Sequence, residues 1–124
     1  MKQKRILIVD DSELVLIMAR DALEAAGYEV FTAGSGIEAN GYIFSPRKPD
    51  LIILDVMLPM LDGNKKAKLL REKEFSREIP ILLLSSKSEE ELRHMVAESE
   101  ANGFIRKPFT SDGIVSRVKE ALAR

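Results

Sequence analysis

The sequence predicts an α/β fold with one doubly wound, five-stranded parallel sheet flanked by five helices. Short apolar runs of strand length alternate five times with segments of helical period, which indicates repeated strand–helix units and a parallel sheet. The runs are apolar throughout, as expected for a sheet that is buried on both faces. The length of 124 residues suits a single domain, which we expect to span residues 1–124.

The first unit joins a buried strand to a capped helix. Residues 6–9 are four consecutive aliphatic residues, the pattern of a buried strand. A helical pattern follows over about residues 13–26, and either Asp11 or Ser12 can cap its N-terminus. Gly27 is expected to end this helix in a left-handed turn, because glycine adopts a positive φ without steric strain.

The second unit is less regular, and the third strand follows it. Residues 28–33 predict the second strand, and a helix is expected over about residues 36–44. Gly41 lies inside that helix and should weaken it by roughly 1 kcal/mol relative to alanine. Residues 51–54 are aliphatic throughout and predict the third strand.

The loop after the third strand carries turn residues and leads into a basic helix. Pro59 lies in this loop, and Asp62-Gly63 is expected to be a turn. The helix that follows should span about residues 64–75. Its positive residues are expected to form a solvated face: Lys65, Lys66, Lys68, Arg71 and Lys73.

The last two units complete the sheet. Residues 81–84 predict the fourth strand, and Ser88 with Glu91 forms a capping-box pattern that begins the fourth helix. Residues 104–105 predict a short fifth strand. The last helix shows one apolar stripe at helical spacing, formed by Ile114, Val115, Val118, Ala121 and Leu122.

Composition and charge indicate an ordinary soluble protein. Hydrophobic residues make up 45% of the chain and charged residues 31%, and 19 basic against 20 acidic residues give a net charge of −1. This balance provides no global field that would draw the chain to nucleic acid or to a membrane. The longest strictly apolar run, residues 14–19, is far shorter than the roughly 20 residues of a membrane span. Since there is also no cysteine for disulfides, we expect a cytoplasmic protein.

Polar residues gather where the predicted strands end. In parallel sheets of this type, ligands bind beyond the carboxyl ends of the strands. Carboxylates, hydroxyls and one amine stand at those ends. They are Asp10 and Asp11 after the first strand, Asp55 after the third, Ser85 and Ser86 after the fourth, and Lys107 after the fifth. The sequence therefore predicts one polar site at this edge of the sheet.

The charges of the predicted site indicate a divalent cation. Two carboxylates about 4 Å apart repel each other by roughly 4 kcal/mol at an effective dielectric constant near 20. Three carboxylates and one ammonium group leave two negative charges, which a single dication would neutralise. Oxygen ligands without histidine or cysteine favour a hard ion, and Mg²⁺ is the hard ion that keeps waters and binds phosphate. A nucleophilic carboxylate, a metal, an amine and a hydroxyl are the parts of phosphoryl transfer to aspartate.

Four segments at the predicted strand ends form a collinear set that covers essentially the whole chain. They are residues 6–12 (ILIVDDS), 49–63 (PDLIILDVMLPMLDG), 79–86 (IPILLLSS) and 107–109 (KPF). Together they resemble the response-regulator receiver domains of two-component signalling. This resemblance implies a flavodoxin-like fold with strand order 2-1-3-4-5.

The resemblance implies roles for the acidic residues. Asp55 matches the phosphoacceptor. Asp11 matches the acid that binds Mg²⁺ directly, and Asp10 matches its neighbour, which acts largely through water. The backbone carbonyl of Met57 matches the position that completes the metal site. Mg²⁺ is therefore the one cofactor that we expect.

The resemblance also implies a conformational switch. Lys107 matches the lysine that contacts a phosphoryl oxygen, and its peptide bond to Pro108 is cis in the family. Ser85 matches the hydroxyl that turns toward the phosphoryl group, and Phe104 matches the aromatic residue that packs inward when this hydroxyl moves. In receivers, the coupled shift alters the face built from the fourth helix, the fifth strand and the last helix.

The resemblance further implies protein partners rather than a substrate. A sensor histidine kinase or a histidine phosphotransfer protein would supply the phosphoryl group, and an unidentified downstream effector would respond to it. The domain would catalyse only its own phosphorylation and dephosphorylation. We expect no direct contact with nucleic acid or membrane, and either a monomer or a phosphorylation-dependent homodimer. No output domain follows Arg124, so we expect either a stand-alone receiver or a fragment of a longer regulator.

Three other functions compete with this interpretation. A receiver-like docking module that works without phosphorylation is the main rival, although all the site residues are present. A phosphohydrolase of the haloacid dehalogenase type would place a second aspartate two residues after the first, where this chain has Met57. A flavin-binding module would place a hydroxyl- or glycine-rich phosphate loop after the first strand, where this chain has Asp10 and Asp11.

The site residues also have purely structural interpretations when each is taken alone. Asp10 and Asp11 could simply cap the first helix, because acids are favoured there. Ser85 could be a loop residue, Lys107 a surface lysine, and Phe104 an ordinary core aromatic. Only the convergence of these residues at one edge of the sheet argues for a site.

Overall fold

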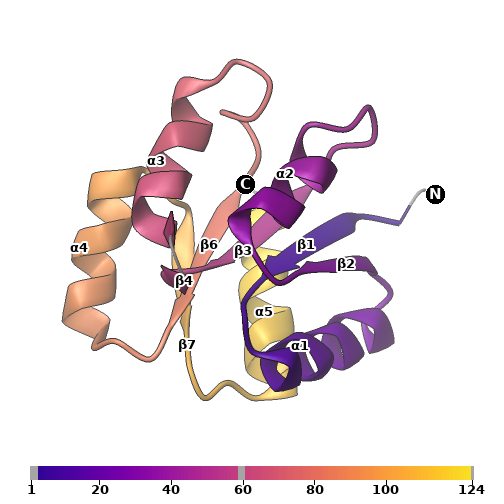
Figure 1. Ribbon diagram of the computed structural model, residues 1–124. Helices are drawn as coiled ribbons and strands as arrows, with labels where there is room; N and C mark the ends of the chain where they lie inside the picture. Colours follow the sequence, from indigo (N-terminus) through magenta and orange to yellow (C-terminus); the bar gives the residue numbers. More distant parts are fainter. Residues whose placement is uncertain (1–2, 59–60, 124) are drawn as a thin grey trace.

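The structure of the chain is a computed structural model, which describes residues 3–58 and 61–123. Pro59 and Met60, which belong to the second of the four segments, lie outside the described residues, as do the outermost ends of the expected 1–124 domain. A central twisted sheet carries helices on both faces (Figure 1).

Five parallel strands form the central sheet. They are β1 (Arg5–Val9), β2 (Glu29–Ala33), β3 (Leu51–Asp55), β6 (Ile81–Ser85) and β7 (Gly103–Arg106). The strands pair in the order β2-β1-β3-β6-β7, and each neighbouring pair is parallel. Counted along the chain, this is the order 2-1-3-4-5, which confirms the predicted fold class. Because every strand runs in the same direction, all five carboxyl ends lie at one edge of the sheet.

Helices cover both faces of the sheet. They are α1 (Glu13–Ala25), α2 (Gly36–Ile43), α3 (Gly63–Glu72), α4 (Glu89–Ser99) and α5 (Ser111–Leu122). Helices α1 and α5 pack on one face, and α2, α3 and α4 pack on the other. None of these helices, in the part of the chain that the structure describes, has the length and apolar character needed to cross a membrane.

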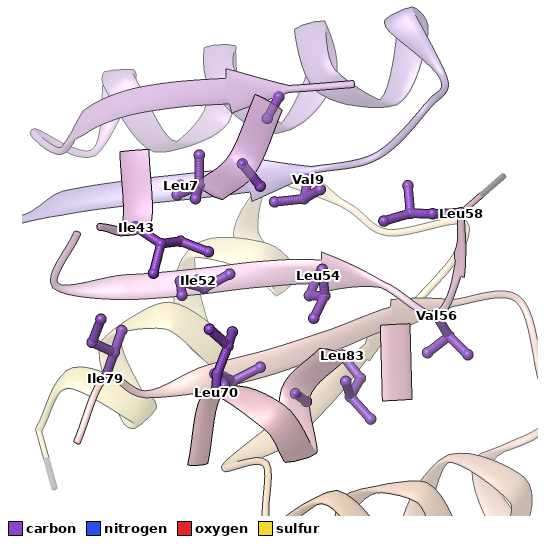
Figure 2. Packing of buried hydrophobic residues seen from close by; sticks show 14 of the residues in the cluster. Leu7, Val9, Ile43, Ile52, Leu54, Val56, Leu58, Leu70, Ile79 and Leu83 are labelled. Carbon is purple, nitrogen blue, oxygen red and sulfur yellow. The ribbon is translucent and has the colours of Figure 1, made fainter. Parts of the chain in front are cut away.

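Each strand of the sheet contributes side chains to two separate hydrophobic clusters. In β1, Leu7 and Val9 belong to the cluster under α2, α3 and α4, while Ile6 and Ile8 belong to the cluster under α1 and α5. Side chains alternate between the two faces of a strand, so a sheet covered on both sides needs apolar residues at every position. Figure 2 shows the first cluster, which includes Leu7, Val9, Ile43, Ile52, Leu54, Leu70 and Leu83.

The ends of α1 illustrate how local chemistry sets the element bounds. Of the two predicted caps, Ser12 is the one in place, and its Oγ accepts a hydrogen bond from the backbone N–H of Val15 at 3.3 Å. Gly27, just beyond the helix, has a φ of +97°, as its type predicts.

The segment between β3 and α3 differs most from the prediction. A short antiparallel hairpin, β4 (Met57–Leu58) with β5 (Leu61–Asp62), follows β3 and was not expected. Asp62 is the N-cap of α3 rather than a free turn residue, because its Oδ1 accepts hydrogen bonds from the amides of Asn64 and Lys65, the second and third residues of the helix. The helix also ends at Glu72 and not at Phe75.

Gly63, the first residue of α3, lies directly against the end of β3. Its N–H donates to the carbonyl of Val56 at 2.9 Å. A Cβ at this position would lie 2.1 Å from the carbonyl oxygen of Asp55 and 2.8 Å from the Cα of Val56. Both neighbours are backbone atoms, so no side chain can rotate away. Glycine is therefore required here for the close approach of α3 to the strand that carries Asp55.

Replacing Gly63 by alanine is expected to lower the free energy of unfolding by about 1–3 kcal/mol, because the backbone must move to relieve the overlap. Urea unfolding measures this change. Gly41→Ala in α2 is the matched control: its Cβ would meet no atom within 4 Å, and it should raise stability by up to about 1 kcal/mol. A Gly63→Ala variant as stable as wild type would contradict the packing argument.

Candidate functional site

Three acidic residues meet at the carboxyl edge of the sheet. Asp10 follows β1 directly, and Asp55 is the last residue of β3. These two strands are neighbours in register, with Val9 opposite Leu54, so the next residue of each strand lies at the same level. Carboxylate oxygens of Asp10, Asp11 and Asp55 all lie within 4.8 Å of one another. The fold therefore brings all three predicted acids together.

The three carboxylates differ in exposure and in their hydrogen bonds. Asp10 is fully buried, Asp55 is 4% exposed, and Asp11 is exposed to solvent. Asp10 Oδ1 accepts from the N–H of Ser12 at 2.8 Å, and Asp55 Oδ1 accepts from the N–H of Met57 at 2.9 Å. Each buried carboxylate is thus held by the backbone amide two residues further on. Their Oδ2 atoms remain for other partners.

Lys107 supplies the positive charge that these Oδ2 atoms face. Its Nζ lies 2.7 Å from Asp10 Oδ2 and 3.5 Å from Asp55 Oδ2. The lysine follows β7, its N–H donates to the carbonyl of Ser85 at 2.8 Å, and its peptide bond to Pro108 is cis. Asp10 Oδ2 is therefore in a close ion pair with Lys107, although it accepts no hydrogen bond of good geometry, whereas Asp55 Oδ2 has only a long contact with the same amine.

Burial and neighbouring charge shift two pKa values at the site. Burial raises the pKa of Asp55 above its ordinary value of 3.8, and the negative charge of Asp10 adds to the rise. The hydrogen bond from Met57 and the charge of Lys107 act in the opposite direction without cancelling it. Burial alone would lower the pKa of Lys107, but its hydrogen bond to Asp10 and the charges of Asp55 and Asp10 outweigh it, so that pKa is raised.

The donor set fits a hard divalent cation. All three clustered groups are carboxylates, and their oxygens lie close enough together to share one ion. Lys107 is the only amine within ion-pair distance of this cluster among the described residues, so the cluster keeps a negative excess. Met57 lies beside it, tied to Asp55 through its amide, and its side chain is 65% exposed. Negative charge, oxygen donors and an exposed acid at the rim all suit Mg²⁺.

The hydroxyl of Ser85 is held by the loop that follows its strand. Ser85 ends β6 and is buried, and its Oγ accepts from the N–H of Lys87 at 3.0 Å. Arg106 of β7 donates from its Nε to the carbonyl of Lys87 at 3.1 Å. The loop between β6 and α4 is thus anchored on both sides of Lys87. Sequence reasoning missed this part played by Lys87 and Arg106, because backbone acceptors leave no residue-type signal.

Phe104 is the second residue of the edge strand β7. It is opposite Leu83 of β6, and its partly buried ring packs against the cluster under α2, α3 and α4. The guanidinium carbon of Arg117, from α5, lies 5.5 Å from the centre of this ring. Phe104 is therefore neither a fully buried core residue nor a free surface residue.

Comparison with known proteins points to one family. A model described as "Response regulator receiver domain" matches residues 6–119. The alkaline phosphatase synthesis transcriptional regulatory protein PhoP of Bacillus subtilis is 42% identical over 121 residues, which cover 98% of this chain and 49% of that protein. The phosphate regulon transcriptional regulatory protein PhoB of Pseudomonas aeruginosa is 42% identical over 121 residues, which cover 98% and 52%. The chain thus spans about half the length of these curated relatives.

Solved structures agree in fold. The chemotaxis response regulator CheY4 of Vibrio cholerae is 31% identical to this chain, with a TM-score of 0.89. The match covers 97% of this chain and 99% of that one. The sheet order and the helices on both faces thus belong to a fold already seen in a chemotaxis response regulator.

Replacing Asp55 by asparagine is expected to stabilise the protein at neutral pH in the presence of a chelator. The change removes the charge of a buried carboxylate that faces Asp10, and we expect the free energy of unfolding to rise by about 1–3 kcal/mol. This is less than the roughly 4 kcal/mol of a full repulsion at 4 Å, because the change also removes one of the two charged partners of Lys107. Because the pKa of Asp55 is higher in the folded state than in the unfolded state, the folded protein takes up the proton more readily. The stability that this provides is complete below pH 3.8 and is lost as the pH rises through the pKa of the folded state.

Urea unfolding of both proteins between pH 3 and pH 8 measures this difference. The gain of the Asp55→Asn variant over wild type should widen with rising pH across that window. Asp21→Asn, at an exposed position of α1, is the control and should show no widening gain. A stability difference that does not change with pH would show that the Asp55 charge does not oppose folding.

Proposed function

Because this chain belongs to the response regulator receiver domain family, we propose that it is a phosphorylation-dependent signalling switch whose phosphoacceptor is Asp55. Receiver domains of this family are signalling domains of two-component systems. The observation that carries the proposal is the unequal position of Lys107 between two buried carboxylates. Because the amine lies closer to Asp10 Oδ2 than to Asp55 Oδ2, the Oδ2 atom of Asp55 is the one more available for reaction.

The proposed step is a transfer of a phosphoryl group to Asp55. Its Oδ2 attacks the phosphorus atom of the donor, a new P–O bond forms, and the bond from phosphorus to the donor's leaving group breaks with the electron pair going to that group. Meanwhile, Oδ1 stays hydrogen-bonded to the amide of Met57, which orients the carboxylate. The Lys107 amine is placed to hold a phosphoryl oxygen, since it already lies 3.5 Å from Asp55 Oδ2.

We propose that Asp11, Asp55 and the backbone carbonyl of Met57 hold Mg²⁺ directly, and that Asp10 contributes largely through water. The exposure of Asp11 supports this division, because a ligand at the rim can accept an ion from solvent while the buried Asp10 is already paired with Lys107. When bound, the ion would supply positive charge that offsets the repulsion among the carboxylates and the phosphoryl oxygens.

The proposed response begins at Ser85. To reach a phosphoryl oxygen, its hydroxyl gives up the hydrogen bond from the Lys87 amide, and the loop before α4 shifts. Phe104 then packs further inward beside the moved hydroxyl. Together these changes alter the face formed by α4, β7 and α5, which is where we place the contact with a downstream effector.

Two kinds of partner follow from this function. A sensor histidine kinase or a histidine phosphotransfer protein would donate the phosphoryl group, and the effector would respond to the altered face. The two relatives named above are described as transcriptional regulatory proteins, and the chain spans about half of each. We propose that the domain occupies residues 1–124, acts in the cytoplasm as a monomer or a phosphorylation-dependent homodimer, and makes no nucleic-acid contact of its own. Its only catalysis would be its own phosphorylation and dephosphorylation.

Wild-type protein is expected to bind Mg²⁺, and Asp11→Asn is expected to weaken that binding at least about tenfold, as loss of a charged ligand does. Isothermal titration calorimetry with MgCl₂ measures both affinities. Asp21→Asn removes an acid from the same helix outside the cluster and should leave binding unchanged. Equal affinity in wild type and Asp11→Asn would remove Asp11 from the proposed metal site.

Incubation with acetyl phosphate and Mg²⁺ is expected to add the mass of one phosphoryl group to the wild-type protein. Asp55→Ala should gain no mass, because Asp10 Oδ2 is held in a close ion pair with Lys107 and Asp11 lies exposed at the rim of the cluster. Asp112→Asn, at an exposed position of α5, should be modified like wild type. Intact-protein mass spectrometry distinguishes these outcomes. If wild type gained no mass, the docking module that works without phosphorylation would become the better explanation.

A further inference from the structure

Arg117 and Phe104 lie on elements that pack against opposite faces of the sheet. Helix α5 covers the face shared with α1, through Ile114, Val118 and Ala121. The ring of Phe104 packs on the other face, with the cluster under α2, α3 and α4. Nevertheless, the Arg117 guanidinium lies 5.5 Å from the ring centre. The arginine side chain must therefore pass around the outer edge of the sheet.

The edge strand β7 leaves room for this crossing. It pairs with β6 on one side only, and no other strand of the described residues covers its outer edge. Gly103, next to Phe104, has no side chain, and a small cavity of about 50 Å³ beside it is lined in part by Leu82, Gly103 and Arg117. Among the described residues, no carboxylate lies within ion-pair distance of Arg117. The ring of Phe104 is thus a principal partner of this cation.

We propose that Arg117 is a positioning residue that holds the Phe104 ring in its observed orientation and so favours the unphosphorylated arrangement of the switch. The cation attracts the face of the ring and keeps it in its partly buried position beside the edge strand. Inward packing of Phe104 separates the two groups and gives up this attraction. This inference rests on the proposed function, since it assigns a consequence to the movement of Phe104.

The expected size of the effect is modest and measurable. A cation–π contact at an exposed site shifts an equilibrium by about two- to fivefold. Because the ring orientation and the occupation of Asp55 are linked, anything that favours the inward orientation should tighten binding of a phosphoryl mimic by the same factor. Arg117→Met keeps an unbranched stem close in length to the aliphatic part of arginine and removes the charge. Arg117→Lys keeps the charge.

The orientation of the Phe104 ring can be measured by NMR in protein labelled at phenylalanine, without any ligand. Arg117→Met should raise the population of the inward orientation about two- to fivefold, and Arg117→Lys should restore most of the wild-type population. Lys119→Met is the matched control, because Lys119 lies on the side of α5 that faces α1. An unchanged population of the inward ring orientation in Arg117→Met would overturn the proposal, whether or not Asp55 is phosphorylated.

Titration with beryllofluoride and Mg²⁺, a non-covalent mimic of the phosphoryl group, tests the coupling. Arg117→Met should bind it about two- to fivefold more tightly than wild type, and this gain should vanish in a Phe104→Leu background, where the ring is absent. A shifted ring without tighter binding, or a gain that persists without the ring, would overturn the coupling. Failure of the wild-type protein to bind the mimic at all would instead count against the proposed function.

Discussion

The close approach of two buried carboxylates is the interaction on which the rest of the site depends. Asp10 and Asp55 stand at the ends of β1 and β3, which are adjacent in the middle of the sheet and locked in register by backbone hydrogen bonds. Neither strand can move away from the other without breaking that pairing. The repulsion between the two acids is therefore a fixed property of the fold, and the surrounding groups must compensate for it.

The compensation is local and unequal. A backbone amide fixes one oxygen of each acid, and the amine of Lys107 contacts the other oxygen of Asp10 more closely than that of Asp55. Gly63 lets α3 begin directly against the backbone of Asp55, so the start of this helix also packs against the end of β3. Because Asp55 is the less well compensated acid, its raised pKa and the chemical role that we propose for it have the same origin.

Much of this arrangement could be predicted from the sequence, because it depends on the types of residue at the strand ends. Continuous aliphatic runs place Asp10 and Asp55 at the carboxyl edge, and Ser12 and Gly27 mark the ends of α1. The strand order, by contrast, came from family resemblance and not from the pattern. The β4–β5 hairpin was missed because two-residue strands leave no periodicity. The contact of Arg117 with Phe104 was missed because it depends on a long side chain crossing an edge, which no local pattern records.

The position of the proposed switch residues, Ser85 and Phe104, follows from the difference between inner and edge strands. The fixed acids lie on β1 and β3, which have neighbours on both sides, whereas Phe104 lies on β7, which has a neighbour on one side only. Lys107 directly follows the same edge strand, and its amide bonds to the carbonyl of Ser85. One edge strand thus connects the amine that faces the acids, the backbone of the hydroxyl residue and the aromatic ring. In the switch that we propose, a change of charge between the inner strands would shift the edge of the sheet while the centre stays in place, because the edge is bound by fewer hydrogen bonds.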